Sequence, residues 1–293
     1  MKYAWIKDQR DRFPVATMCR VLGVSRSGFY AWQKREPSAS EQRRAEIAQA
    51  AAAAHEQSHG IYGYRKVHDD LQEQQIDCCR ETVRKVMREN GLVSRTKRKF
   101  VVTTDSDHGQ PVAENLLDRQ FEAAAPNQKW TADITYVATQ EGWLYLAVVM
   151  DLFSRRIVGW SMSASLQATL VIDALTMALD QRRPTPGLMH HSDRGSQYAS
   201  CDFRQLLDDH GIACSMSRRG NCYDNAPTES FFGKLKAEWV HGENYATRQE
   251  AQQHIFQYIE SFYNRQRKHA ALGYLSPATF EALHQTHNPK QVA

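Results

Sequence analysis

Two kinds of hydrophobic periodicity divide the chain. Up to about residue 100, apolar residues recur at helical spacing in short runs that Gly and Pro interrupt. From residue 126 three successive runs are rich in β-branched and aromatic residues, with short polar breaks between them, which is typical of strands. Helical and strand-like runs then alternate. We therefore predict an all-helical N-terminal region followed by an α/β domain, whose mixed sheet carries helices on both faces.

The residues between these two patterns are predicted to be a linker. They lack sustained periodicity and contain Gly and Pro. The predicted organisation is a helical region over 1–100, a linker over 101–125, a core with a C-terminal helical extension over 126–285, and a tail over 286–293.

A helix is predicted to start at Asn225, a good N-cap, with Pro227 in its first turn. Glu229 and Lys236 then lie two turns apart on one edge of the helix, beside its apolar face. A solvated salt-bridge face would show the same pair. The apolar stripe consists of Phe231, Phe232, Leu235 and Trp239.

The first helical patterns have the outline of a helix-turn-helix. Between residues 13 and 35, Gly23 supplies a turn and Ser25 can cap a second helix that carries Arg26. In a helix-turn-helix this second helix lies in a DNA groove. Many small helical hairpins have the same pattern.

Charge favours a second DNA-binding unit. The net charge is +4, but residues 1–100 hold 20 Lys and Arg against 12 Asp and Glu. A helical run over 80–91 continues into a basic tail, and a second basic turn follows an amphipathic run over 248–264. Alternatively, the helix, the basic tail and the basic turn are solvent-exposed surface segments that do not bind DNA. The cations assigned to DNA here are Arg80, Arg84, Lys85, Arg88, Arg95, Lys97, Arg98, Arg265, Arg267 and Lys268.

Composition indicates a cytoplasmic protein. The six cysteines have no disulfide-rich spacing, and the longest strongly apolar run is too short to span a bilayer. The charged N-terminus lacks the apolar segment of a signal peptide. His55 and His59 could share a metal with Cys78 and Cys79, but adjacent cysteines bind one zinc ion poorly.

Three carboxylates are candidates for a metal site. Asp133 lies inside the first strand-like run, Asp193 directly follows a short strand, and Glu229 lies on the helix that starts at Asn225. If they converge, they offer the oxygen ligands that Mg²⁺ prefers, or Mn²⁺ in its place. Two such ions would serve an in-line phosphoryl displacement, and Lys236 would meet the backbone phosphate. If they do not converge, Asp133 would be a surface residue of an edge strand, Asp193 an ordinary turn aspartate, and Glu229 one half of a helix salt bridge.

Spacing and local sequence identify a resemblance. The 35 residues between Asp193 and Glu229, with Asp133 upstream, resemble the D,D(35)E arrangement of the retroviral-integrase-type superfamily. W-T-A-D-I-T-Y, H-S-D-R-G-S-Q-Y-A-S and Y-D-N-A-P-T-E-S-F-F-G-K-L-K-A-E are similar to second-frame transposases of the bacterial insertion-sequence-three family. G-Y-R-K-V and R-K-V-M-R-E-N-G-L are similar to the helical region of that family.

The resemblance implies a ribonuclease-H-like core with Asp133, Asp193 and Glu229 as catalytic metal ligands. It implies an enzyme that nicks double-stranded DNA at the terminal inverted repeats and joins the 3′-OH to another phosphodiester. It also implies a homo-multimer on nucleoid DNA, and fusion to an upstream-frame product with a helix-turn-helix and a leucine zipper.

Two other functions stay open. The first is a DNA-binding regulator of transposition whose core is folded but idle. The second is a related nuclease, such as a junction resolvase or ribonuclease H, which usually carries four acids. Asp151 is the candidate for the fourth, although we expect it to close a strand instead.

Overall fold

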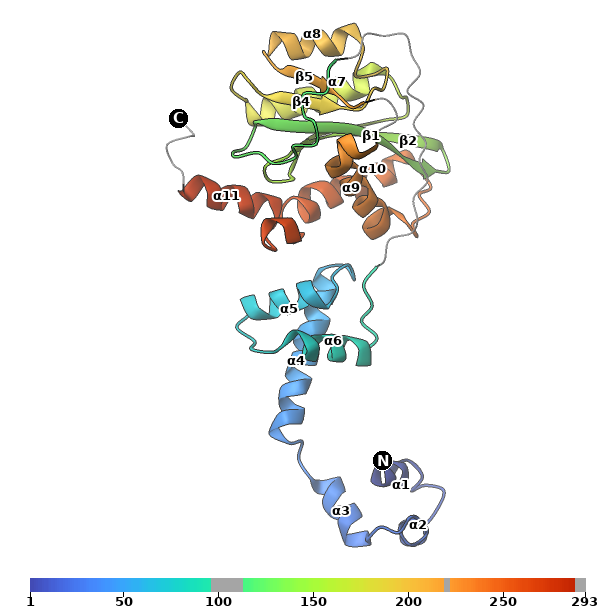
Figure 1. The fold of residues 1–293 in the computed structure, drawn as a ribbon. Helices are drawn as coiled ribbons and strands as arrows, with labels where there is room; N and C mark the ends of the chain where they lie inside the picture. Colours follow the sequence, from blue (N-terminus) through green and yellow to red (C-terminus); the bar gives the residue numbers. More distant parts are fainter. Residues whose placement is uncertain (96–112, 219–221, 288–293) are drawn as a thin grey trace.

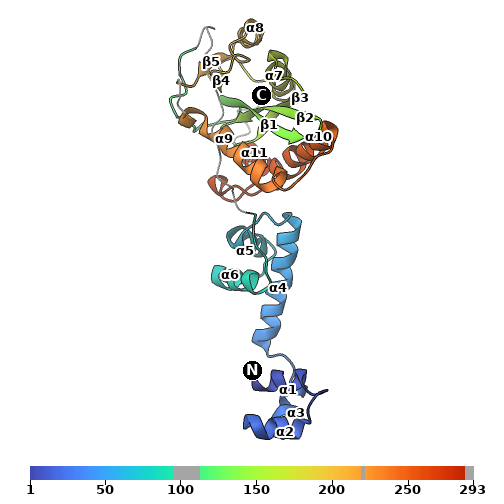
Figure 2. The same ribbon diagram turned by 90° about the vertical axis from the view of Figure 1, so that its right-hand side faces the viewer.

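The structure is a computed structural model that describes residues 1–95, 113–218 and 222–287. Its parts follow one another along a long axis: a first helical unit, a second helical unit and the α/β core (Figures 1 and 2). The helices of the two units are α1 (Lys2–Asp8), α2 (Val15–Leu22), α3 (Arg26–Lys34), α4 (Ala39–Gln57), α5 (Tyr64–Glu73) and α6 (Arg80–Glu89).

The first unit has the predicted helix-turn-helix outline. Gly23 takes a left-handed conformation after α2, with φ of 63°, which glycine adopts without a steric penalty. Ser25 then caps α3, because its hydroxyl accepts a 2.9 Å hydrogen bond from the Gly28 N–H. A small apolar core holds the three helices together, formed by Ile6, Met18, Cys19 and Phe29.

The second unit packs α5 and α6 against the longer α4. Ser38 and Glu41 form a capping box that fixes the start of α4. The helix predicted over 80–91 is present as α6, and its apolar residues Val83, Val86 and Met87 are buried. None of the helices in the described residues has the length and apolar character that crossing a bilayer requires.

The core is a five-stranded mixed sheet, as predicted. The strand order is β3-β2-β1-β4-β5. β1 pairs antiparallel with β2, and β2 with β3, whereas β4 runs parallel to both β1 and β5. The strands are β1 (Lys129–Thr139), β2 (Gly142–Asp151), β3 (Ile157–Ser163), β4 (Met189–Ser192) and β5 (Ala213–Met216).

Helices cover both faces of the sheet (Figure 1). On one face α7 lies so close to β3 that a Cβ on Gly159 would meet the Ala174 carbonyl oxygen at 2.1 Å. The opposite face carries α9, α10 and α11. The helices of the core are α7 (Ala168–Arg182), α8 (Cys201–Asp209), α9 (Ala226–Leu235), α10 (Arg248–Phe256) and α11 (Pro277–His287). Shorter helical turns are η1 (Cys222–Asn225), η2 (Lys236–Val240), η3 (Gln257–Tyr263) and η4 (Ala270–Leu272).

The end of the predicted linker packs on the core. Leu117 is buried, and the Leu116 and Leu117 N–H groups donate to the Ser215 hydroxyl on β5 at 2.9 and 3.2 Å. The Met216 N–H in turn donates to the Glu114 carbonyl. Residues 114–117 therefore lie beside β5, so this part of the predicted linker belongs to the core.

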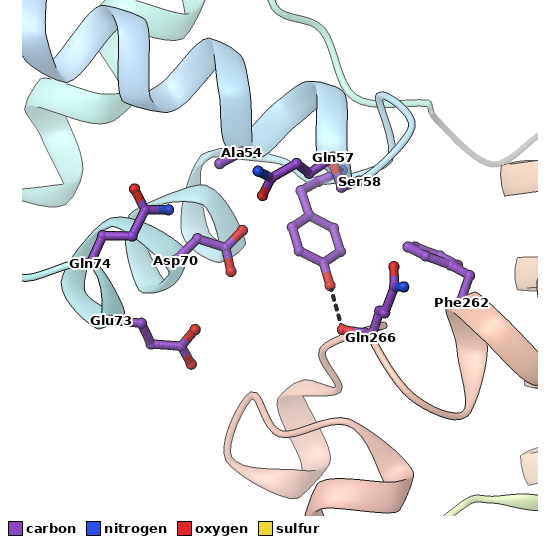
Figure 3. Close-up of a pocket in the computed structure, with 9 residues that line it drawn as sticks. Ala54, Gln57, Ser58, Asp70, Glu73, Gln74, Phe262 and Gln266 are labelled. Carbon is purple, nitrogen blue, oxygen red and sulfur yellow. Dashed lines mark hydrogen bonds between the residues drawn. The ribbon is translucent and has the colours of Figure 1, made fainter.

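The second helical unit meets the core at a contact that we call the seam. Tyr62 lies at its centre, where its hydroxyl donates to the Gln266 carbonyl at 3.1 Å (Figure 3). The same hydroxyl accepts a hydrogen bond from the Lys268 N–H at 2.8 Å. Beside it, Lys268 makes ion pairs with carboxylates of α5. A hollow of about 520 Å³ opens at this contact, lined from both sides by residues that include Gln57, Asp70 and Phe262.

Candidate active site

Asp133 lies on the central strand of the sheet. β1 is bordered by β2 and β4, and its neighbouring positions Thr131 and Ala132 are buried. The Asp133 carboxylate is half-buried and accepts a 2.8 Å hydrogen bond from the Ile134 N–H. The strand therefore holds an acid where its immediate neighbours are withdrawn from water.

Strand register brings Asp193 to the level of Asp133. The parallel ladder pairs Thr131 with His191, and each acid is two residues beyond that pair. Parallel strands advance together and their side chains alternate between the two faces. The two acids therefore lie at equivalent positions along neighbouring segments of the sheet. Asp193 follows β4 directly, and the Gly195 N–H donates to its carboxylate at 2.9 Å.

Helix α9 brings Glu229 over β1. The Thr228 hydroxyl donates to the Thr131 hydroxyl at 2.7 Å, and the Asn225 amide donates to the Ala132 carbonyl at 3.0 Å. Glu229 follows Thr228 and is exposed. Asn225 is the N-cap residue of this helix, as predicted, but its side chain makes no capping hydrogen bond, because its amide binds β1 instead.

The predicted apolar stripe of this helix is confirmed. Its apolar stripe is buried, which presses α9 onto the sheet, and the helix continues beyond Leu235 as the π-helical turn η2. Lys236 is half-buried there, with its Nζ 5.0 Å from the centre of the Tyr136 ring.

Electrostatic coupling shows that the acids share one environment. Burial raises the pKa of Asp133 well above its usual value, and the charges of Asp193 and Glu229 raise it further. The Ile134 N–H and Lys236 act in the opposite direction. Burial also raises the pKa of Glu229, with a second contribution from Asp193. Negative charge is therefore in excess at this end of the sheet.

This donor set fits a hard divalent cation. Three carboxylates supply only oxygen ligands, and a cation would relieve the repulsion that raises the pKa of Asp133. Within the described ranges, however, no three His, Cys, Asp or Glu side chains are gathered as tightly as a finished metal site. The acids are thus neighbours with the appropriate chemistry, without the closed arrangement of a loaded site.

Comparisons with known proteins agree with this geometry. Family models match an HTH-like domain at residues 41–100 and an integrase core domain at residues 123–222 and 210–277. The transposase InsF for insertion sequence IS3A from Escherichia coli (strain K12) is 45% identical over 283 residues, which cover 96% of this chain and 98% of that protein. The chain belongs to the IS3 transposase family.

A second relative supports the assignment. The uncharacterized 31 kDa protein of insertion element IS600 from Shigella sonnei is 48% identical over 92% of this chain and 99% of its own length. Among solved structures, a simian T-cell lymphotropic virus intasome gives a TM-score of 0.46 at 16% identity, covering 79% of this chain and 74% of that one. The HTLV-2 integrase catalytic core in complex with magnesium gives 0.42 at 16%, covering 54% and 99%. These structural likenesses are weak, and the sequence relatives decide the family.

Several cations assigned to DNA are exposed in this IS3-family chain. Arg84 is engaged by Glu81 at 2.7 Å, and an Arg95 guanidinium N–H donates to the Glu238 carbonyl at 2.8 Å. Lys97 and Arg98 lie outside the described residues. The exposed members of the set are Arg26, Arg80, Arg84, Lys85, Arg88, Arg95 and Arg265.

Arg267 and Lys268 require a correction. Both are buried, at 5% and 8% exposure. Arg267 binds both oxygens of Glu238, while Lys268 binds Asp70 at 2.8 Å and Glu73 at 2.9 Å, together with Asp69. Lys268 therefore ties the core to α5 across the seam, and Arg267 forms an ion pair within the core beside it. Because both cations are already paired with carboxylates, they are not presented to phosphates.

Sequence reasoning missed the polar residues around the acids. Thr131 and Thr228 are buried polar residues that lie close in sequence to Asp133 and Glu229. This closeness is the only feature of the sequence that could have pointed to them. Tyr198 is a further example: its buried hydroxyl has no hydrogen-bond partner in the described part of the chain, and Asp133 and Asp193 add to the effect of burial in raising its pKa.

Proposed function

We propose that this IS3-family chain is a DDE transposase that nicks DNA at the terminal inverted repeats of its element. The exposed 3′-OH then attacks another phosphodiester, so that one P–O bond forms as another breaks and the protein forms no covalent bond to DNA. The observation that carries the proposal is the coupling of Asp133, Asp193 and Glu229, contributed by β1, the end of β4 and α9.

Asp133, Asp193 and Glu229 would hold two Mg²⁺ ions, or Mn²⁺ in their place. When bound, such ions supply activation of the attacking oxygen and stabilisation of the leaving 3′ oxygen. Asp133 and Asp193 would form the fixed part of this ligand set, because Asp133 lies on β1 and Asp193 directly follows β4, the strand paired with it. Glu229 adds a carboxylate from the exposed side of α9, and Lys236 would contact the backbone phosphate beside it.

The helical units would bind the double-stranded element end. Arg26 lies at the start of α3, the second helix of the helix-turn-helix, and Arg80, Lys85 and Arg88 project from the exposed side of α6. Arg84, Arg95 and Arg265 would add phosphate contacts, as would Lys97 and Arg98. Two element ends must meet, which favours a homo-multimer, acting alone or with the upstream-frame product.

The test is incubation of the full chain with a labelled element end and Mg²⁺, with and without the upstream-frame product. We expect nicked and joined products that disappear when Mg²⁺ is chelated. Asp193→Asn should abolish both products and still bind the element end. Asp173→Asn is the matched control, because this exposed acid lies on α7 across the sheet from α9.

Two results would count against the proposal. Full activity of Asp193→Asn would remove the carboxylate mechanism. Specific binding without any product, in both the presence and the absence of the upstream-frame product, would favour the idle regulator.

A further inference from the structure

Buried polar contacts fasten the first turn of α9 to the central strand. We propose that Asn225 and Thr228 are positioning residues, which set the place of Glu229 relative to Asp133 and so determine how tightly the site binds its metal. This inference rests on the proposed function and goes beyond it, because neither side chain is a candidate ligand.

The hydroxyl pair is the more direct of the two contacts. Thr228 and Thr131 are fully buried, and their hydroxyl oxygens lie 2.7 Å apart. Thr228 immediately precedes Glu229, and Thr131 is two residues before Asp133 on the same face of β1. A shift of the helix along the strand would break this bond and move Glu229 by the same amount.

Asn225 makes the second contact on the same side of the helix. It lies three residues before Thr228, a spacing that places both on one face of a helix. Its amide donates to the Ala132 carbonyl, the residue directly before Asp133. With two contacts a turn apart, α9 can neither slide nor rotate on β1 without losing one of them.

The other half of the Asn225 amide argues against a purely structural role. Its Oδ1 is buried and receives no hydrogen bond from the described residues. Reversing the amide would place this oxygen against the Ala132 carbonyl, so the orientation is fixed by the bond to β1. A buried acceptor without a donor destabilises the fold. Stability alone therefore does not account for an asparagine here.

Asp224 anchors the same turn from the opposite side. It is fully buried and accepts hydrogen bonds from Arg119, Arg218 and Asn115. Arg119 and Asn115 belong to the segment before β1, and Arg218 lies two residues after β5. The start of α9 is thus held between β1 and β5, while Glu229 remains exposed one residue beyond the Thr228 contact.

A matched pair of variants tests the hydroxyl contact. Thr228→Val keeps the shape of the side chain and loses the hydroxyl, whereas Thr228→Ser keeps the hydroxyl. We would titrate the full-length variants with Mn²⁺, following the free ion by electron paramagnetic resonance, and record thermal unfolding with and without Mn²⁺. Asp133→Asn is the reference for a lost site.

We expect Thr228→Val to weaken Mn²⁺ binding by about tenfold, the lower end of the loss seen when groups that orient metal ligands are removed. Thr228→Ser should bind as the wild type does. Adding Thr131→Val to Thr228→Val should cost no further affinity, because the two hydroxyls form one bond. Asn225→Ala should also weaken Mn²⁺ binding, with a melting temperature without metal that is unchanged or higher.

Three outcomes overturn the proposal. Wild-type affinity in Thr228→Val, with Asp133→Asn clearly impaired, removes the positioning role and leaves the metal site intact. An equal loss in Thr228→Ser and Thr228→Val assigns the effect to packing. A wild-type protein that binds Mn²⁺ no better than Asp133→Asn removes the proposed metal site, and the positioning role with it.

Discussion

Two regions of the molecule withdraw acids from water and treat them in opposite ways. On β1 the pKa of Asp133 is raised well above its usual value, and two further acids increase the effect. At the seam the pKa of buried Glu238 is lowered, because Arg267 and the Tyr258 hydroxyl donate to its oxygens and outweigh burial. The seam balances its charges, whereas the site leaves negative charge in excess. Unbalanced charge of this kind is typical of groups that do chemistry.

Glu281 on α11 follows the same pattern as Glu238. Burial alone would raise the pKa of Glu281. Hydrogen bonds from Arg182, Ser154 and Arg156 outweigh burial, and the pKa is lowered. Asp151 belongs to the same network at the end of β2, where Arg182 binds it at 3.1 Å. Asp151 thus closes a strand, as expected, and is not part of the carboxylate site.

The largest expected effect separates activity from stability at the site. Asp133→Asn should lower strand cleavage by about 1,000-fold or more, since removing a metal ligand forfeits several kcal/mol of transition-state stabilisation. The same change should leave the melting temperature unchanged or raise it, because it removes one of three mutually repelling charges. Cleavage assays and thermal unfolding at pH 7 without metal measure the two effects. A large fall in melting temperature would show that Asp133 is structural.

For Glu238, whose charge is balanced by Arg267, we expect a substitution to lower stability. Glu238→Gln should destabilise the protein by about 3–5 kcal/mol, the usual cost of leaving one partner of a buried ion pair without the other. Urea unfolding measures the change. Glu243→Gln, at an exposed acid, is the control.

A double variant sharpens the same comparison. Glu238→Met combined with Arg267→Met should recover much of the stability lost in Glu238→Gln, because an apolar pair of similar volume often replaces a buried ion pair at little cost. A double variant as unstable as Glu238→Gln would show that the ion pair itself makes a net contribution to the free energy of unfolding.

The sequence was sufficient for the part of the site that follows from local pattern. Strand-like runs placed Asp133, a strand end placed Asp193, and helical periodicity placed Glu229. The structure adds the convergence of the first two, through the parallel pairing of β1 with β4. The mixed sheet, the helices on both of its faces and the helix-turn-helix outline were also predictable, because each depends on hydrophobic periodicity within single segments.

Contacts between distant segments were not predictable in this way. The run R-Q-R-K-H looks like a phosphate-binding turn, but the carboxylates that engage Lys268 lie about 200 residues earlier on α5. Asn225 has a local preference for capping, which the Ala132 carbonyl overrides. In both places a tertiary partner decided the role, and a single sequence does not reveal it.

A smaller effect is expected at the rim of the seam. Lys268→Met removes the cation that three α5 carboxylates share, and should destabilise the protein by about 1–3 kcal/mol. Two of these acids are partly exposed, so water compensates some of the loss. Limited proteolysis should show faster cleavage between the second helical unit and the core. Cleavage at the wild-type rate would mean that the Tyr62 and Arg95 contacts suffice to hold the seam.

The last effect concerns a cation of the seam whose pKa is lowered. Burial, and then the charge of Arg267, lower the pKa of Lys66 to about 7, and its Nζ lies 4.7 Å from the centre of the Tyr62 ring. Between pH 7 and the ordinary lysine pKa of about 10.4, the unfolded chain therefore binds a proton here that the folded chain has released. This group makes the folded state more stable as pH rises through that window.

Lys66→Met should remove this contribution, so the difference in free energy of unfolding between variant and wild type should shrink as pH rises from 7 to 9. Below pH 7 the variant should be the more stable protein, because it no longer buries a charge. Urea unfolding across this range measures the difference, with Lys34→Met as the control at an exposed lysine. A difference that does not change with pH would show that Lys66 remains charged, and that the seam balances this cation as completely as it balances Arg267.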